Sequence, residues 1–160
     1  MTERETDRLI AWAAELRRVH TRIREALALT RAAVRDAEAD PGSTERAARD
    51  LLLYCHGFCV ALDEHHRGED RALFPGIEAA HPGLAPVLRA LEQDHSMIAH
   101  LLQGLRAAVD RAADAAVLDR HLEGIAAIME SHFRYEERQL LRVLEGLRIE
   151  ASVTDALGSM

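Results

Sequence analysis

Apolar positions recur at alternating steps of three and four residues along most of this chain. The first such run covers about residues 5–39, where the inward stripe reads Leu9, Ala13, Leu16, His20, Ile23, Leu27, Thr30 and Val34. Residues at this spacing share one face of an α-helix, so the run predicts a long amphipathic helix. Asp40-Pro41-Gly42-Ser43 interrupts it, and Ser43 or Thr44 is expected to cap the next helix.

Three further stripes follow the first. The second holds Leu51, Cys55, Phe58, Leu62, His65 and Glu69, and it is expected to end near Phe74 because Pro75-Gly76 follows. The third begins after His81-Pro82-Gly83 and holds Leu84, Leu88, Leu91, His95, Ile98, Leu102, Leu105 and Val109. After a break near residues 112–115, the fourth holds Leu118, Leu122, Ile125, Met129, His132, Glu136 and Leu140.

Four long helices joined by short connections predict antiparallel neighbours. We therefore expect an all-α fold, an antiparallel up-down-up-down four-helix bundle over residues 1–147. Residues 148–160 are expected to form a loosely held C-terminal tail. Apolar residues make up 48% of the chain and aromatic residues only 4%, which suits packing by leucine and alanine in helices.

One histidine interrupts each apolar stripe, and the four histidines are expected at one level of the bundle. Residues of an antiparallel hairpin face each other when their midpoint falls in the turn. The midpoint of His20 and His65 is about residue 42.5, that of His65 and His95 about 80, and that of His95 and His132 about 113.5. Each midpoint falls in a predicted break, so the four rings should meet in one layer.

Carboxylates accompany two of these histidines. Glu69 follows His65 by four residues, and Glu136 follows His132 by four, so each pair projects from one helix face. A single histidine on an apolar stripe is usually a hydrogen-bonded core residue. Burying four imidazoles and two carboxylates together is costly without a cation or a complete hydrogen-bond network. The sequence therefore predicts a metal site formed by His20, His65, Glu69, His95, His132 and Glu136.

Other polar residues near these stripes are alternative ligands. His66 and Asp70 also have the i, i+4 spacing, but they lie off the stripe from Leu51 to Leu62, and His66 is expected at the surface. Glu137 competes with Glu136, and helical geometry favours Glu136; Glu137 is then either a support for a ligand or a further ligand. His100 follows Ala99, the residue four positions after His95, and successive residues of a helix are rotated by about 100°. His100 therefore points away from the face that carries His95, and its binding to the ion is an open alternative. Tyr54 and His121 are expected near the inward faces in another layer, either as a hydrogen-bonded pair or as a relay.

Charge and cysteine content narrow the class of protein. The formal net charge of −7 argues against a nucleic-acid partner, which needs a basic face. No signal peptide and no bilayer-spanning apolar run is visible. Cys55 and Cys59 lie one helical turn apart, a spacing that rarely permits a disulfide, so two reduced thiols are expected. Together these features predict a cytoplasmic protein with no membrane partner; the oligomeric state is open.

The ordered ligand set resembles that of the hemerythrin-like, or HHE cation-binding, domain family. Its pattern is a single His, then His-x-x-x-Glu, then His, then His-x-x-x-Glu on successive helices, and the segment from Glu69 to Pro75 resembles the end of the family's second helix. The resemblance covers about residues 10–147. It implies two non-haem iron ions with carboxylate and oxo or hydroxo bridges, where Glu69 and Glu136 bridge and the histidines are terminal ligands.

The sequence departs from the oxygen-carrying relatives in one respect. Their third helix supplies two histidines at i and i+4, whereas this chain has Ala99 at the second position. A missing ligand implies an open position or a substitute oxygen ligand, which favours reaction over reversible carriage.

Two classes of function fit such a centre. The first is reaction with a small oxidant, namely hydrogen peroxide in a catalase-like disproportionation, dioxygen or nitric oxide. The second is non-enzymatic binding, storage or sensing of oxygen, nitric oxide or iron. A third reading, a purely structural helical module, predicts unchanged folding after chelation.

Overall fold

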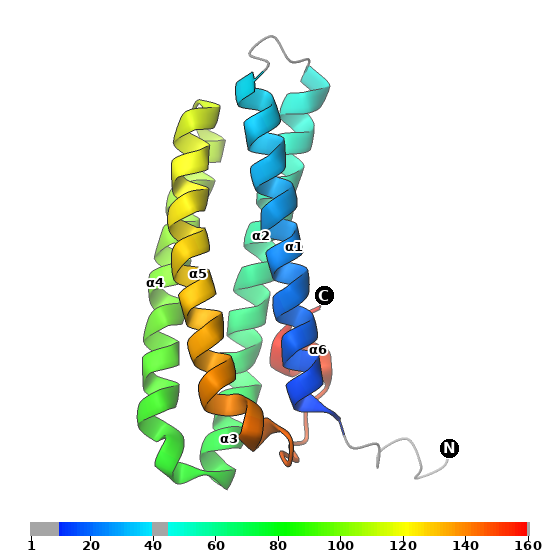
Figure 1. The fold of residues 1–160 in the computed structure, drawn as a ribbon, viewed down its shortest axis with the longest axis vertical. Coiled ribbons are helices and arrows are strands. Elements are labelled where there is room, and N and C mark those ends of the chain that lie inside the picture. The colour runs from blue at the N-terminus through cyan, green and yellow to red at the C-terminus, as the bar shows by residue number, and fades with distance from the viewer. Residues whose placement is uncertain (1–9, 40–44, 160) are drawn as a thin grey trace, which may run out of the picture.

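The computed structural model describes residues 10–39 and 45–159, with the side chains of residues 45–48 excepted. Four long helices dominate it: α1 (Trp12–Ala39), α2 (Glu45–Gly68), α4 (Ala85–Asp110) and α5 (Ala115–Leu144). The described residues contain no strand, so the prediction of an all-α fold is confirmed. Figure 1 shows the chain rising along α1, descending along α2, rising along α4 and descending along α5. The predicted start at Glu5 and the predicted cap at Ser43 or Thr44 lie outside the described residues.

The four long helices surround one core. α1 packs against α2 and α5, and α4 packs against α5 and α2, so each helix has two long neighbours. The side chains that fill the core are those of the predicted stripes, including Leu16, Ile23, Leu62, Leu91, Ile98, Leu122, Ile125 and Met129. Removing each such side chain from water contributes roughly 1.5–3 kcal/mol, which explains why the spacing of apolar residues sets the helix faces.

The end of the second helix differs from the expectation. After Gly68 the chain forms a π-helical segment, η1 (Glu69–Leu73), and then α3 (Phe74–Ala80) and the 3₁₀ turn η2 (Pro82–Leu84). The prediction that Pro75-Gly76 ends the helix is wrong, because Pro75 stands in the first turn of α3, where no intrahelical N–H is required. In η1 the Phe74 N–H donates to the Glu69 carbonyl, five residues back. This extra residue in the turn changes which side chains face the core after Glu69.

The C-terminal residues are not a loosely held tail. They form a short helix, α6 (Val153–Leu157), which packs against α1, α2 and η1. The side chains of Ala156 and Leu157 are fully buried. In Figure 1 this helix lies beside the lower half of α2, at the same end of the bundle as α3.

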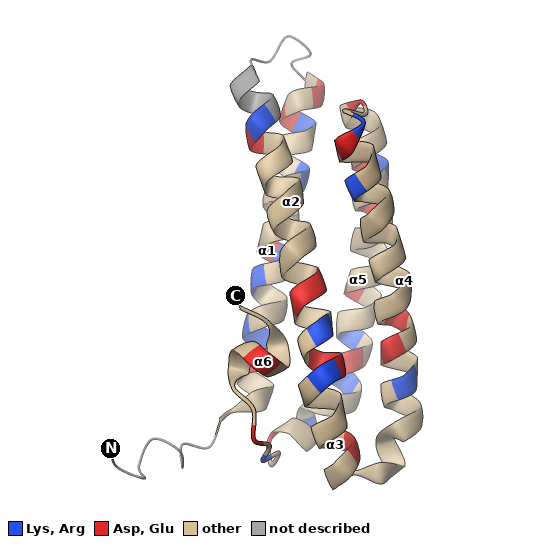
Figure 2. Ribbon diagram, turned by 180° about the vertical axis from the view of Figure 1, so that it is seen from behind, with Lys and Arg blue, Asp and Glu red and all other residues tan. Residues whose placement is uncertain are grey.

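Charged residues are mixed over the outside of the bundle. Figure 2 shows acidic and basic positions interspersed along the helices on the side of the molecule that faces the viewer. Among the helices of the described residues, none has the length and apolar character needed to cross a membrane.

Candidate metal centre

Seven buried His and Glu side chains converge in the lower half of the bundle as two overlapping sets. The first set is His20, His65, Glu69 and Glu136, and the second is His66, Glu69, His95 and His132. Within each set, one potential ligand atom from every residue lies within 4.8 Å of the others. All six residues selected from the sequence are therefore brought together, and His66 joins them. Ligands about 2 Å from a common ion require this kind of clustering.

The two carboxylates lie between histidines of the two sets. Glu69 Oε1 is 3.3 Å from His65 Nε2 and 3.4 Å from His95 Nε2. Glu136 Oε2 is 3.3 Å from His20 Nε2 and 3.6 Å from His132 Nε2. Each carboxylate thus touches one histidine from either set.

Most of the inward-facing polar atoms have no hydrogen-bond partner. Nine buried side-chain N and O atoms of the described residues lack one, and seven of them belong to the two sets: Nε2 of His20, His65 and His66, and both carboxylate oxygens of Glu69 and Glu136. The carboxylates are near the rings, but the contacts lack hydrogen-bond geometry. Native proteins rarely leave buried polar atoms unpaired, and each such atom requires an explanation. The donor set therefore fits a cation enclosed between these atoms.

Each of the four histidines predicted from the sequence makes a hydrogen bond through Nδ1, the ring nitrogen that faces away from the centre. Nδ1 of His20 donates to Glu137 at 3.0 Å, and Nδ1 of His95 donates to Asp70 at 2.7 Å. The partner of His132 Nδ1 is Asp94 at 3.1 Å, and that of His65 Nδ1 is the Leu157 carbonyl at 2.8 Å. When such a ring is neutral and Nδ1 is the donor, Nε2 carries the lone pair that faces the centre. Metal-binding histidines show the same arrangement, in which the second nitrogen fixes ring orientation.

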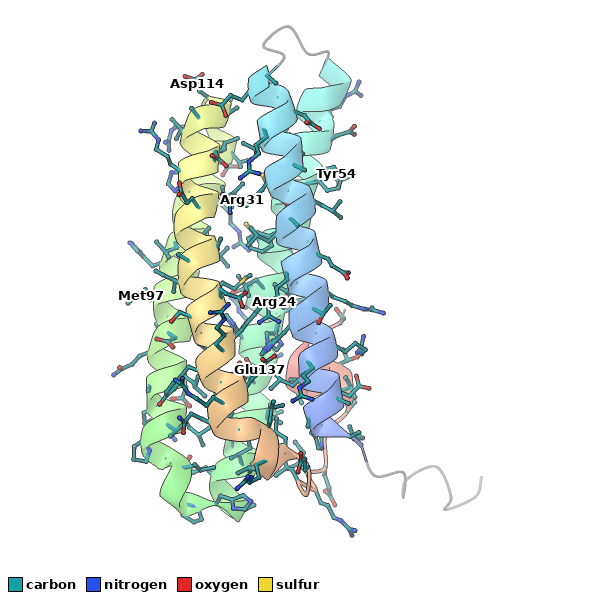
Figure 3. The ribbon with its side chains drawn as sticks, viewed as in Figure 1. Arg24, Arg31, Tyr54, Met97, Asp114 and Glu137 are labelled. Carbon is teal, nitrogen blue, oxygen red and sulfur yellow. The ribbon has the colours of Figure 1, made fainter. Side chains whose placement is uncertain are left out.

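Aromatic packing restrains the His20 ring as well. The Phe133 ring stacks on it with centroids 3.8 Å apart and planes within 9°. The Arg24 guanidinium lies over Phe133, 5.3 Å from the ring centroid, and is itself held by Glu130. Figure 3 shows Arg24 and Glu137 on the face where α1 meets α5.

Burial keeps three of the rings neutral. It lowers the pKa of His65 and of His132 to about 4, and it lowers the pKa of His66 well below its ordinary value. A neutral imidazole is the form that binds a metal ion, so these rings are in the required state at neutral pH.

Two other groups of the sets, His95 and Glu69, are charged in the absence of an ion. Burial disfavours the His95 cation, but the hydrogen bond to Asp70 and the nearby carboxylate of Glu69 outweigh burial and raise the pKa of His95 to about 9. Burial likewise opposes ionisation of Glu69, but the neighbouring His65 and His95 lower the pKa of this carboxyl to about 2. An ion entering the centre would therefore displace the proton of His95.

His66 is a correction to the sequence analysis, which placed it at the surface. Its ring is buried and stacks on His95 with centroids 3.9 Å apart. The sequence contained a signal, because Cys59 and Leu73 stand seven residues before and after His66 and both are buried. His66 faces the centre from α2, while Ala99 offers no ligand and His100 is exposed on α4.

Two other expectations have different outcomes. Glu137 holds the His20 ring and Glu136 faces the centre, as helical geometry favoured. Tyr54 is 43% exposed and points away from the bundle in Figure 3, so the expected inward pairing of Tyr54 with His121 is wrong. Asp70, Asp94 and Leu157 were not selected from the sequence, although each bonds to one of the predicted histidines.

Comparison with known protein families assigns the fold. The model of the hemerythrin HHE cation binding domain matches residues 13–144, which is most of the chain. The chain belongs to the hemerythrin HHE family. No curated protein and no solved structure matches it. The HHE match begins at the start of α1 and ends with α5, so it includes every residue of both sets but not α6.

Proposed function

We propose that this HHE protein holds two non-haem iron ions, one in each residue set, and that the centre reacts with a small oxidant. The observation that carries the proposal is the pair of buried sets that share Glu69. The first set offers two imidazoles and two carboxylates, and the second offers three imidazoles and one carboxylate. Mixed imidazole and carboxylate ligands suit iron, and a set of two histidines with a carboxylate is typical of ferrous sites with open positions.

The carboxylates and the histidines would have different roles in binding the ions. Glu69 and Glu136 would bridge the ions, because each carboxylate lies between histidines of the two sets. The five histidines would bind terminally, and the Nδ1 partners of His20, His65, His95 and His132 would fix those four rings. When bound, iron supplies one-electron redox chemistry and open positions for dioxygen, peroxide or nitric oxide.

The location of the centre favours small reactants. The ligand atoms are enclosed by four long helices, and all seven side chains of the sets are buried. Hydrogen peroxide, dioxygen and nitric oxide are small enough to reach such a centre through fluctuations of the packing. We place hydrogen peroxide first, in a catalase-like disproportionation in the cytoplasm, since that reaction requires no organic substrate.

The test is the metal content and visible spectrum of protein purified from iron-replete cells, before and after addition of hydrogen peroxide. We expect about two irons per chain, near-ultraviolet bands from oxygen ligands of ferric iron, and release of oxygen after peroxide is added. Two irons without turnover would instead favour reversible binding, storage or sensing. Absence of stoichiometric metal would exclude the centre.

The role of His66 is tested separately by His66→Ala, with His56→Ala as the control on the exposed face of the same helix. If His66 binds the second ion, anaerobic titration of its variant with ferrous iron should show one unchanged binding step and one weakened step. Two unchanged steps would show that His66 is only a packing residue.

A further inference from the structure

We propose that the C-terminal helix α6 is part of the metal centre and acts as a positioning element for His65. This inference rests on the proposed function, because it assigns a role to α6 in binding an ion in the first residue set. α6 would act by presenting the Leu157 carbonyl to the His65 ring. The Nδ1–H of His65 donates to this carbonyl at 2.8 Å, in a buried hydrogen bond that joins residues 92 positions apart in sequence.

The support of His65 differs in kind from that of the other histidines. Nδ1 of His20, His95 and His132 bonds to carboxylates from α5, η1 and α4, elements that belong to the bundle itself. His65 alone among these four bonds to a backbone carbonyl, and that carbonyl comes from outside the bundle. The last carbonyls of a helix have no partner within it, so the end of α6 has an acceptor free for His65.

Two glycines allow α6 to approach α2 this closely. A Cβ atom added at Gly158 would lie 2.9 Å from the His65 backbone nitrogen, and one added at Gly68 would lie 2.9 Å from the Ala156 carbonyl carbon. Gly158 also has φ of 89°, a conformation that favours glycine. The contact is therefore backbone against backbone, on either side of the His65–Leu157 hydrogen bond.

Polar contacts fix both ends of α6. The Ser152 hydroxyl caps its first turn by accepting from the Asp155 N–H at 3.0 Å. Beyond the helix, the Ser159 hydroxyl donates to Glu64 on α2 at 2.8 Å. Together with the buried Ala156 and Leu157, these contacts place the carbonyl at one defined position beside Nδ1 of His65.

The consequence is an asymmetry between the two residue sets. His65 belongs only to the first set, so loss of α6 docking should weaken one ion and leave the second set intact. Loss of a partner that orients a metal-binding histidine typically lowers metal affinity 10- to 100-fold. A helix that merely covered apolar surface would change stability without distinguishing the two ions.

The experiment uses the full chain with Gly158→Ala, which adds a Cβ at the point of closest contact. Gly124→Ala is the matched control, because a Cβ at Gly124 meets nothing within 4 Å. Ser152→Ala, which removes the cap of α6, provides a milder second variant. Two quantities are measured: hydrogen exchange of the His65 Nδ1–H by NMR of the metal-free protein, and stepwise anaerobic titration with ferrous iron.

We expect a protected His65 Nδ1–H and two binding steps in the wild type and in Gly124→Ala. Gly158→Ala should lose the protection and show one step weakened by about 10- to 100-fold, and Ser152→Ala should show the same pattern to a smaller degree. Lost protection with two unchanged steps, or equal weakening of both steps, would overturn the role of α6. A wild type that binds no iron but retains a protected Nδ1–H would refute the proposed function while confirming the docking of α6.

Discussion

The two ends of the bundle are built from the same helices but treat buried polar groups differently. At the upper end, near the turn between α4 and α5, the core consists of apolar residues such as Val34, Leu105 and Leu118. Thr30, the one buried polar side chain there among the described residues, donates to the Ala26 carbonyl at 2.8 Å. At the lower end, seven buried polar side chains converge, and seven of their atoms have no hydrogen-bond partner.

This difference shows where the fold is arranged for binding and where it is arranged for stability. Outside the lower end, two buried atoms of the described residues lack a hydrogen-bond partner, Arg31 Nε and Asp119 Oδ1. These two atoms lie 4.0 Å apart and form an ion pair with each other. The unpaired atoms of the lower end face one another across a shared centre instead. Buried polar atoms without hydrogen bonds destabilise a folded chain. A bound ion should therefore stabilise the lower end by interacting with these atoms.

Removal of metal should give the largest effect. Chelation is expected to destabilise the protein, because an ion at a concentration 1,000 times its Kd stabilises the folded state by roughly 4 kcal/mol. In a domain of this size 1 kcal/mol shifts Tm by about 2–4 °C, so two ions correspond to a drop in Tm on the order of 15–30 °C. Thermal unfolding with and without chelator, followed by re-addition of ferrous iron, measures this difference. An unchanged Tm would mean that the lower end gains no stability from bound ions.

Glu69→Gln tests the shared carboxylate. Glu69 belongs to both residue sets, so this variant should lose tight binding of both ions, whereas a change in a histidine should affect one. Iron per chain, measured after desalting, should fall from about two to less than one half. Glu25→Gln, on the exposed face of α1, is the control and should retain both ions. Retention of one tightly bound ion by Glu69→Gln would show that the carboxylate is not shared.

Leu105→Ala tests the upper end. Leu105 is fully buried, so loss of its side chain should lower the free energy of unfolding by about 2–5 kcal/mol. Leu53→Ala, at a position 69% exposed, should change it by less than about 0.5 kcal/mol. Both variants should retain the wild-type iron content, because neither residue contacts the centre. Loss of iron from folded Leu105→Ala would show that the two ends are coupled.

The sequence predicted the parts of this molecule that repeat along a helix. Apolar spacing identified four long helices, and the level of His20, His65, His95 and His132 identified the layer where they meet. A single stripe at steps of three and four does not predict His66, because α2 buries two adjacent histidines before it changes to the π-helical η1.

The contacts behind the ligands follow no pattern in the sequence. Asp70 and Asp94 are each 39% exposed, like many surface carboxylates, and only the three-dimensional structure shows that they bond to His95 and His132. The Leu157 carbonyl is a backbone group, so the residue type at position 157 does not predict its contact with His65. Side-chain spacing therefore predicts which residues face the core, but not what holds them in place.

His66→Leu sharpens the comparison, because it should raise stability and lower binding in the same molecule. His66 Nε2 is buried without a hydrogen-bond partner. An apolar side chain of similar size should therefore stabilise the metal-free protein, by about 1–2 kcal/mol in chemical denaturation. The same variant should bind one ferrous ion more weakly. His56→Leu, an exposed change on the same helix, should do neither, and a less stable metal-free His66→Leu would argue that the ring is needed for packing.

The smallest effect concerns Cys55 on α2, above the metal centre. Burial, together with the neighbouring Cys59, raises the pKa of the Cys55 thiol from 9.0 to about 11. The folded protein should therefore hold about 100-fold less Cys55 thiolate than the unfolded chain at pH 8, and a thiol reagent should modify it correspondingly more slowly. Because the pKa is raised in the folded state, the neutral thiol contributes stability below pH 9, and this contribution is lost as the pH rises through about 11.

Metal removal should leave the rate of Cys55 modification in the folded protein unchanged if the apolar end is independent of the centre. A rate that rises on chelation at pH 8, where global unfolding has been excluded by circular dichroism, would show that the bound ions order the helix beyond their own layer.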